Sequence, residues 1–140
     1  MRYLLILGLF FLLSCKNNQS ITGKYESKKF NSIQNKSNSL RKVAYTTGSS
    51  LKINNDSSYE MINCGNIMKG NWKVVQDTLF LFCKSNEYRS DSLNAYGFNG
   101  KQLKCYDKPD FFIINGDELC QVFKEKQNGY SIYKCLIKRE

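Results

Sequence analysis

Histidine is entirely missing from this chain of 140 residues, and its absence limits the chemistry that the protein can carry. Catalysis by a Ser-His-Asp triad or by a Cys-His pair needs an imidazole as the general base. The HExxH zinc site and many other transition-metal sites use histidine as a ligand. The missing residue therefore excludes these hydrolase mechanisms and the commonest kind of zinc enzyme.

Long helical patterns and proline are also scarce. No segment repeats its apolar residues at helical spacing over several turns, and the chain has a single proline, Pro109. The sequence instead contains short runs in which apolar and polar side chains alternate, and clusters of turn-forming residues separate these runs. This pattern is typical of an antiparallel meander and predicts an all-β domain that closes into a barrel or a strongly curved sheet.

Acidic residues are outnumbered, since 12 Asp and Glu stand against 21 Lys and Arg, for a net charge of +9. A basic face would attract anionic surfaces such as lipid headgroups, acidic glycans or acidic proteins. The simpler explanation is codon usage, because Lys, Asn, Ile and Ser are abundant together, as in AT-rich genomes. We prefer this explanation, so the net charge assigns no partner.

The long apolar run of the chain lies at its N-terminus. Tyr3–Leu13 follows the positively charged Arg2 and is too short to cross a bilayer of about 30 Å as a helix, so it reads as a secretory signal. The run ends in Leu-Leu-Ser-Cys, which resembles the bacterial lipobox. The resemblance implies cleavage before Cys15 and attachment of diacylglycerol and a fatty acid such as palmitate, with each buried methylene adding about 0.8 kcal/mol of membrane affinity.

This resemblance divides the chain into three parts: a signal peptide at 1–14, a lipidated tether at 15–22 and one domain at 23–140. No aspartate follows Cys15, so the signal that retains lipoproteins at the inner membrane is absent and we expect the outer membrane, on either face. Loss of Arg2 with the signal lowers the net charge from +9 to +8. An ordinary secretory signal is the disfavoured alternative, because no A-x-A-like cleavage site is present.

Two hairpins are predicted in the first half of the domain. Leu51–Ile53 and Ser58–Ile62 flank a cluster of Asn, Asp and Ser, whereas Gly70–Val75 and Thr78–Cys83 flank a Gln-Asp turn. Their inward side chains would either line an apolar ligand cup or, as is commoner in small barrels, fill the core. The inward set proposed for ligand binding is Tyr59, Met61, Trp72, Val74, Leu79 and Leu81.

Polar stretches separate these hairpins from the rest of the domain. Lys28–Ser39 predicts a loop, and Lys84–Gly100 predicts a second loop with a helical turn at Asp91–Ala95. Further strands follow as far as the C-terminus.

Three of these features together resemble the small lipocalin-like lipoproteins of Gram-negative bacteria. They are the Gly-x-Tyr that ends at Tyr25, the hairpin Leu51–Tyr59, and Gly70-x-Trp72 with the Asp-Thr-Leu-x-Leu strand that returns after it. The resemblance implies an up-and-down barrel of about eight strands with a cup-shaped interior. Tyr25 stands where the first strand of a lipocalin has a tryptophan, and this departure concerns ligand binding more than the fold.

Five cysteines remain after Cys15, in a compartment that favours disulfides. Because five is odd, at least one cysteine stays free or pairs between chains. Each preferred pair brackets one hairpin: Cys64 with Cys83 around the hairpin of Trp72, and Cys105 with Cys120 around a further hairpin predicted at Phe111. A curled rim or a loop position would be needed to bring the Cα atoms within about 7 Å, and several cysteines could instead be small buried hydrophobes.

Other chemistry finds little support in the sequence. Met61, Cys64 and Met68 are soft ligands for copper(I), but they also suit an ordinary strand end, so we predict no metal and no other cofactor. Turn chemistry explains several aspartates, and no carboxylate pair is evident, so we expect no enzyme. Lysines interleaved with aromatics could bind single-stranded nucleic acid, but the export signal argues against that partner.

Two functions remain. The leading hypothesis is a lipid-anchored, non-catalytic binding module that takes a small apolar ligand into the open end of its barrel. The alternative is a structural or interaction protein of the envelope, with a filled barrel that binds a protein or polysaccharide through the loops at Lys28–Ser39 and Lys84–Gly100. A carrier needs an empty cavity of about 300 Å³ or more, and a scaffold does not.

Overall fold

A computed structural model describes residues 20–41, 43–98, 101–124 and 131–139. The predicted signal at 1–14 and the proposed lipidation site Cys15 lie outside the described residues. Within the described ranges the chain forms two short helices, α2 (Ser32–Leu40) and α3 (Asp91–Tyr96). Its strands are β1 (Gly23–Ser27), β2 (Val43–Tyr45), β3 (Ser50–Ile53), β4 (Ser58–Ile62), β5 (Asn66–Val75), β6 (Thr78–Tyr88), β7 (Asp110–Asn115), β8 (Glu118–Lys124) and β9 (Ser131–Arg139).

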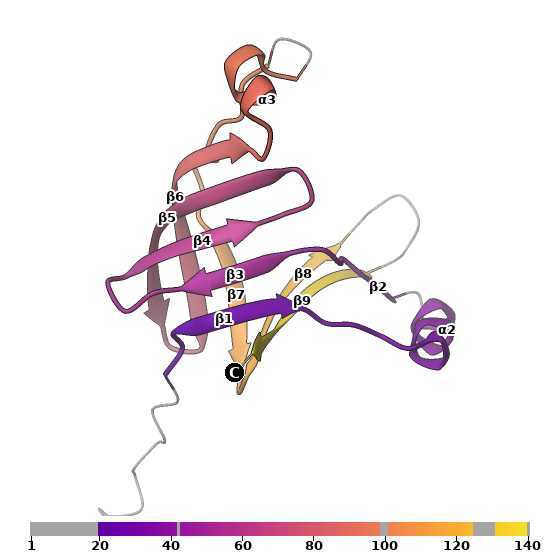
Figure 1. The fold of residues 1–140 in the computed structure, drawn as a ribbon. Coiled ribbons are helices and arrows are strands. Elements are labelled where there is room, and N and C mark those ends of the chain that lie inside the picture. The colour runs from indigo at the N-terminus through magenta and orange to yellow at the C-terminus, as the bar shows by residue number, and fades with distance from the viewer. Residues whose placement is uncertain (1–19, 42, 99–100, 125–130, 140) are drawn as a thin grey trace, which may run out of the picture.

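Eight of these strands form a closed antiparallel barrel (Figure 1). Neighbouring strands pair in the order β1-β3-β4-β5-β6-β7-β8-β9, and β1 returns to pair with β9, which closes the ring. β2 is an additional strand that pairs in parallel with the first residues of β9. The predicted all-β meander that closes into a barrel of about eight strands is therefore confirmed.

Both predicted hairpins are present, with the predicted residues facing inward. Leu51 lies opposite Met61 in the first hairpin, and Trp72 lies opposite Leu81 in the second. Directly opposed residues of an antiparallel pair share one face of the sheet. The alternation in the sequence therefore separates interior side chains from exterior ones, as predicted.

One end of the barrel is filled, and we call it the closed end; it contains the start of β1 and the β3–β4, β5–β6 and β7–β8 turns. Trp72 Nε1 donates a hydrogen bond of 3.0 Å to the carbonyl of Asn54, and the Tyr25 hydroxyl donates one of 2.7 Å to the carbonyl of Ile21. Both aromatic side chains therefore pack in the interior with their polar atoms satisfied. The buried core comprises Tyr25, Leu51, Ile53, Tyr59, Met61, Met68, Leu79, Leu81, Phe112, Leu119 and Leu136.

A bulge at Lys84 bends β6 against β5. The register of the two strands shifts between Lys69 and Gly70. A Cβ atom on Gly70 would lie 1.9 Å from the carbonyl oxygen of Phe82, so no larger residue fits while the two backbones stay this close. Bulges increase local bending and twist, which helps a sheet of this size to close.

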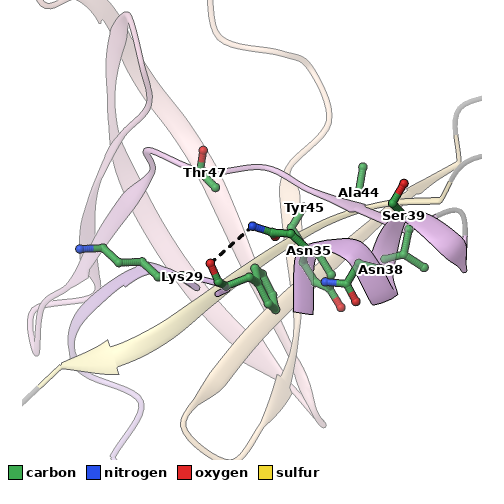
Figure 2. A pocket seen from close by; sticks show the side chains of 9 residues that line it. Lys29, Asn35, Asn38, Ser39, Ala44, Tyr45 and Thr47 are labelled. Atoms are coloured by element: carbon green, nitrogen blue, oxygen red, sulfur yellow. Dashed lines mark hydrogen bonds between the residues drawn. The ribbon is translucent and has the colours of Figure 1, made fainter. Parts of the chain in front are cut away.

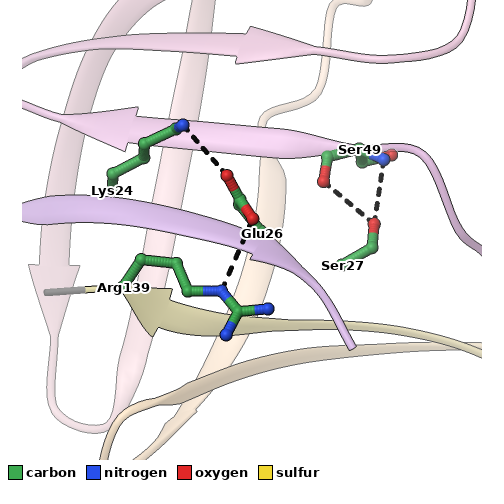
Figure 3. Close-up of polar contacts among 5 residues, drawn as sticks. All are labelled: Lys24, Glu26, Ser27, Ser49 and Arg139. Atoms are coloured by element: carbon green, nitrogen blue, oxygen red, sulfur yellow. Dashed lines mark hydrogen bonds and ion pairs between the residues drawn. The ribbon is translucent and has the colours of Figure 1, made fainter. Parts of the chain in front are cut away.

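Polar contacts join β1 to both of its neighbours in the ring, on the exterior toward β9 and in a buried position toward β3 (Figure 3). On the exterior, Glu26 contacts Lys24 Nζ at 2.9 Å and Arg139 Nε at 3.4 Å, and the hydrogen bond from Lys24 lowers the pKa of Glu26. Ser27, which is buried, donates its hydroxyl to the carbonyl of Ser49 at 2.9 Å and accepts the Ser49 N–H at 2.8 Å. Exposed ion pairs contribute little, so the buried serine contact is the stronger restraint on β1.

The predicted loop at Lys28–Ser39 was wrong, because α2 occupies most of it. A capping box starts the helix: the Asn31 side chain accepts the Gln34 N–H at 2.8 Å, and the Gln34 side chain accepts the Asn31 N–H at 3.1 Å. The predicted helical turn near Asp91 is confirmed as α3. No helix in the described part of the chain has the length and apolarity needed to span a membrane.

The two disulfides join partners other than those predicted. Cys83 pairs with Cys105, and Cys120 pairs with Cys135, with Cα atoms 5.5 Å and 4.2 Å apart. Among the described cysteines, Cys64 carries a free thiol and is exposed. Both predicted pairs, Cys64–Cys83 and Cys105–Cys120, are therefore wrong.

The strand register explains the corrected pairing. Cys83 lies opposite Gly70, six positions along the chain from Cys64, so a rise of about 3.3 Å per residue separates the two cysteines along the barrel. Cys120 instead lies directly opposite Cys135 in the β8–β9 pair. Bracketing a hairpin was a poor guide, because the distance between two cysteines depends on the strand register and not on their order around a hairpin.

Candidate binding site at the barrel mouth

The end of the barrel opposite the closed end holds a pocket of about 370 Å³, and we call this end the mouth. The β4–β5 turn, the end of β6 and the start of β7 surround it. Its walls combine thioether, amide, phenol and charged side chains. They include Met61, Asn63, Asn66, Met68, Asn86, Tyr88, Leu103, Tyr106, Asp110, Gln121 and Lys134.

Lys134 supplies the positive charge of the mouth. Its Nζ donates to Asn63 Oδ1 at 2.9 Å and to Met61 Sδ at 3.5 Å, and it lies 5.9 Å from the centroid of the Phe112 ring. Burial lowers the pKa of Lys134, and the nearby Asp110 carboxylate partly offsets this effect. An ammonium group has three donors, so one donor remains beyond these two contacts.

Asp110 supplies the negative charge, from the first residue of β7. Burial raises the pKa of Asp110, whereas Lys134 lowers it. The same carboxylate, together with burial as the larger cause, raises the pKa of Tyr59 to about 12. Among the described residues no cation lies within 4 Å of Asp110, so Asp110 and Lys134 interact without forming a contact ion pair.

Amide side chains complete the polar wall. Asn66 Nδ2 donates to Asn86 Oδ1 at 2.6 Å, and Asn86 Nδ2 donates to the carbonyl of Lys104 at 3.1 Å. Gln121 lies opposite Lys134 in the β8–β9 pair and is only 6% exposed. Its side chain makes no hydrogen bond to the rest of the described chain, which leaves a donor and an acceptor beside the ammonium.

The Cys83–Cys105 disulfide braces this wall. It joins β6 to the segment that carries Leu103 and Tyr106, two of the residues that line the pocket. A cross-link of this kind limits how far the segment can move from the barrel in the folded state. The position of the wall therefore depends on a covalent bond as well as on packing.

The six residues proposed for ligand binding lie together, but in the core. Four of them are buried in it, and Trp72 and Val74 pack against it. Of the six, Met61 alone also lines the mouth pocket. The polar residues of the mouth were missed, although Gln121 follows Leu119 at the spacing that places both on one face of a strand.

The soft side chains suggested for copper(I) are arranged differently from a metal site. Met61 and Met68 lie opposite each other across β4 and β5, but the Cys64 thiol points to the carbonyl of Thr47 at 3.8 Å. The Lys134 ammonium already lies on the Met61 sulfur, where its charge would repel a metal cation. Within the described residues, no three Cys, Asp or Glu side chains are placed to hold a metal ion.

The fold defines a small closed antiparallel β-barrel with a packed end and a polar mouth. Comparison of the chain with protein-family models, with curated proteins and with solved structures finds no significant match. A function for this barrel therefore has to be argued from the mouth itself, where an ammonium, a carboxylate and amide side chains surround one pocket.

Proposed function

We propose that this protein is a lipid-anchored lipoprotein of the outer membrane, similar to the lipocalin-like lipoproteins, and that its mouth binds a small ligand without catalysis. The observation that supports binding is the mouth pocket of about 370 Å³. Ligand pockets begin at about 300 Å³ and combine apolar walls with a few placed polar groups. Lys134 and Gln121 supply such groups here, with hydrogen-bonding capacity left over.

The ligand that fits this pocket is small and amphipathic. The closed end is already filled by the protein's own core, so little interior space is left for a long apolar chain. At the mouth, Met61, Met68 and Leu103 offer an apolar surface, and Lys134 offers a donor to a carboxylate or carbonyl oxygen. We therefore propose a ligand with a short apolar part and an oxygen acceptor.

The proposed anchor is compatible with access to the mouth. β1 begins at the closed end, where Gly23 lies opposite Ile53, so the tether at 15–22 meets the barrel there. Eight extended residues span at most about 28 Å. With Cys15 in the membrane, the attachment point at the closed end would lie within that distance of the lipid, and the opposite end with the mouth would be accessible from the aqueous compartment.

Fractionation tests the anchor separately from the ligand. Replacing Cys15 by Ala should move the protein from the membrane to the soluble fraction, because no acyl chain would be attached. If the Cys15→Ala protein stays with the membrane as the native protein does, the proposed lipidation is wrong.

Native and denaturing mass spectrometry of the full chain, purified from its own source, test the ligand. We expect a discrete organic mass on the native protein that denaturation removes. Lys134→Met, which keeps most of the length of the side chain but removes its charge, should lose that mass. Lys52→Met, at an exposed position of β3, should keep it.

The alternative is an interaction protein with a filled barrel. The packing of all six predicted ligand residues in or against the core favours this alternative. A native mass without any adduct, in protein taken from its own source, would decide for it and against the small ligand. The next step would then be cross-linking to identify a partner in the envelope.

A further inference from the structure

β2 presents an unused strand edge. Its pairing with β9 uses alternate residues, and Thr46 donates its N–H to the carbonyl of Tyr133 at 2.9 Å. Backbone groups of alternate residues point to the same side of a strand, so Ala44 and Thr46 face β9, while Val43 and Tyr45 direct their N–H and C=O groups to the other side. No strand in the described part of the chain pairs with that second edge.

A groove of about 520 Å³ borders this strand, between β2 and α2 (Figure 2). Aromatic contacts hold the helix beside the strand, because the rings of Phe30 and Tyr45 lie 4.3 Å apart and those of Tyr45 and Tyr133 lie 5.6 Å apart. Asn35 Nδ2 donates to the carbonyl of Phe30 at 3.5 Å, which adds a polar link across the turn before α2. The groove is therefore formed before any partner arrives.

Polar groups on the helix side of this groove are available. Asn38 and Ser39 line it, and their side chains make no hydrogen bond to other described residues. Figure 2 shows both on the helix, across from β2. A segment lying along β2 could therefore bond to the strand edge on one side and to side chains of α2 on the other.

Positive side chains lie on the groove and on the helix beside it. Lys29 is the one charged residue among those that line the groove, and Lys36 and Arg41 belong to α2 and its C-terminal cap. Lys28 is neutralised by Glu118, at 2.7 Å between Nζ and Oε1. Lys29, Lys36 and Arg41 form no ion pair with any other described residue. This excess of positive charge beside an open strand edge matches an acidic partner.

We propose that the groove between α2 and β2 binds an extended acidic peptide segment of another protein, which adds to the sheet beside β2. The backbone of that segment would pair with the N–H and C=O groups of Val43 and Tyr45, as in other cases of strand addition. Its acidic side chains would lie near Lys29, Lys36 and Arg41. This site is separate from the mouth, so a test of peptide binding does not depend on whether the mouth binds the proposed small ligand.

Synthetic peptides test the proposal on the full chain in detergent micelles. The probe is the blocked hexapeptide Glu-Val-Thr-Val-Glu-Val, and the charge control replaces both glutamates by lysine. Two further analogues carry N-methyl groups on alternate residues, one set for each edge of the extended peptide. We expect the acidic peptide to bind, the lysine peptide to bind at least about tenfold more weakly, and one methylated analogue to lose about tenfold in affinity relative to the other.

Hydrogen–deuterium exchange locates the contact. Bound peptide should slow the exchange of the Val43 and Tyr45 amides, which point away from β9, and leave those of Ala44 and Thr46 unchanged. Equal affinity of the two methylated analogues, or binding without protection at Val43 and Tyr45, would overturn the proposal. Binding to phosphatidylglycerol vesicles or to an acidic oligosaccharide, without binding of the peptide, would overturn it in favour of a different partner.

Substitutions test whether the peptide contacts the strand edge of β2 and the positive side chains beside the groove. Val43→Pro removes the outward N–H at an edge position that tolerates proline, and should weaken the acidic peptide several-fold. Replacing Lys29, Lys36 and Arg41 together by Gln should weaken it about tenfold. The matched control replaces three exposed lysines elsewhere, Lys73, Lys84 and Lys104, by Gln and should change the affinity less than twofold. An equal loss in both triple variants would mean that only the net charge matters, which contradicts a specific site.

Discussion

The closed end and the mouth of this barrel are built from the same strands but use their interior positions differently. At the closed end, interior side chains such as Leu79 and Ile53 are buried in the core, with at most 2% of their surface exposed. At the mouth, the same alternation places Gln121 and Lys134 inside, around a pocket. Apolar burial stabilises one end, whereas desolvation of a charge and an amide costs stability at the other. The proposed binding site therefore lies in the part of the interior whose side chains contribute least to stability.

The largest expected difference between the two ends comes from removing core volume. Leu79→Ala should lower the free energy of unfolding by about 3 kcal/mol, within a range of about 2–5, because Leu79 is fully buried and a cavity would remain. Urea unfolding measures this loss. Val75→Ala, at a half-exposed position of the same hairpin, should cost about 0.5 kcal/mol or less. Similar losses in both variants would mean that the closed end is not tightly packed.

The two disulfides should contribute similarly to stability but differ in their effect on binding at the mouth. Replacing Cys83 and Cys105 by Ser should cost about 3 kcal/mol and should also weaken binding at the mouth, because the wall segment is released. Replacing Cys120 and Cys135 by Ser should cost a similar amount and leave mouth binding unchanged. Urea unfolding and native mass spectrometry measure the two properties, and equal effects on binding would contradict a bracing role for Cys83–Cys105.

A smaller effect should appear in the pH dependence of stability. Burial raises the pKa of Asp110, so the folded state holds this proton more tightly than the unfolded state, whose pKa is near 3.8. The contribution of Asp110 is fully favourable below that value and is lost as the pH rises through the folded pKa. Asp110→Asn removes this loss and should be more stable than the native protein at pH 7.

We expect a gain of at most about 1 kcal/mol for Asp110→Asn, because solvent reaches the carboxylate and because Lys134 loses a favourable charge. Urea unfolding between pH 3 and pH 8 should show the difference from the native protein shrinking toward the acid end. Asp107→Asn, at an exposed position, is the control and should show no such trend. A constant difference across the range would show that Asp110 does not titrate differently in the folded state.

The smallest effect on the free energy of unfolding should come from a substitution outside both the closed end and the mouth. Ile33 on α2 is 78% exposed, and the helix buries none of its residues. Ile33→Ser should therefore change the free energy of unfolding by about 0.5 kcal/mol or less, as measured by urea unfolding. A larger loss would mean that α2 contributes to the stability of the barrel, which its exposure contradicts.

Hairpins were predictable because their signals are local. Asn54 and the residues after it form a turn, and the alternation on both sides identifies the interior residues. The capping box of Asn31 and Gln34 is equally local, so α2 could have been predicted from it. The disulfides could not be predicted in the same way, because Cys120 and Cys135 meet only when the register of β8 against β9 is known.

The alternating strands, the turns between them and the apolar residues of the closed end can be predicted from the sequence, because these depend on neighbours a few positions apart. Which cysteines pair, where β2 docks and which polar residues meet at the mouth follow only from the folded barrel. Lys134 and Asn63, for example, are 71 positions apart and come within 2.9 Å only because β9 and β4 belong to the same closed ring. Closure of the ring is a non-local event, so its consequences do not appear in any short stretch of sequence.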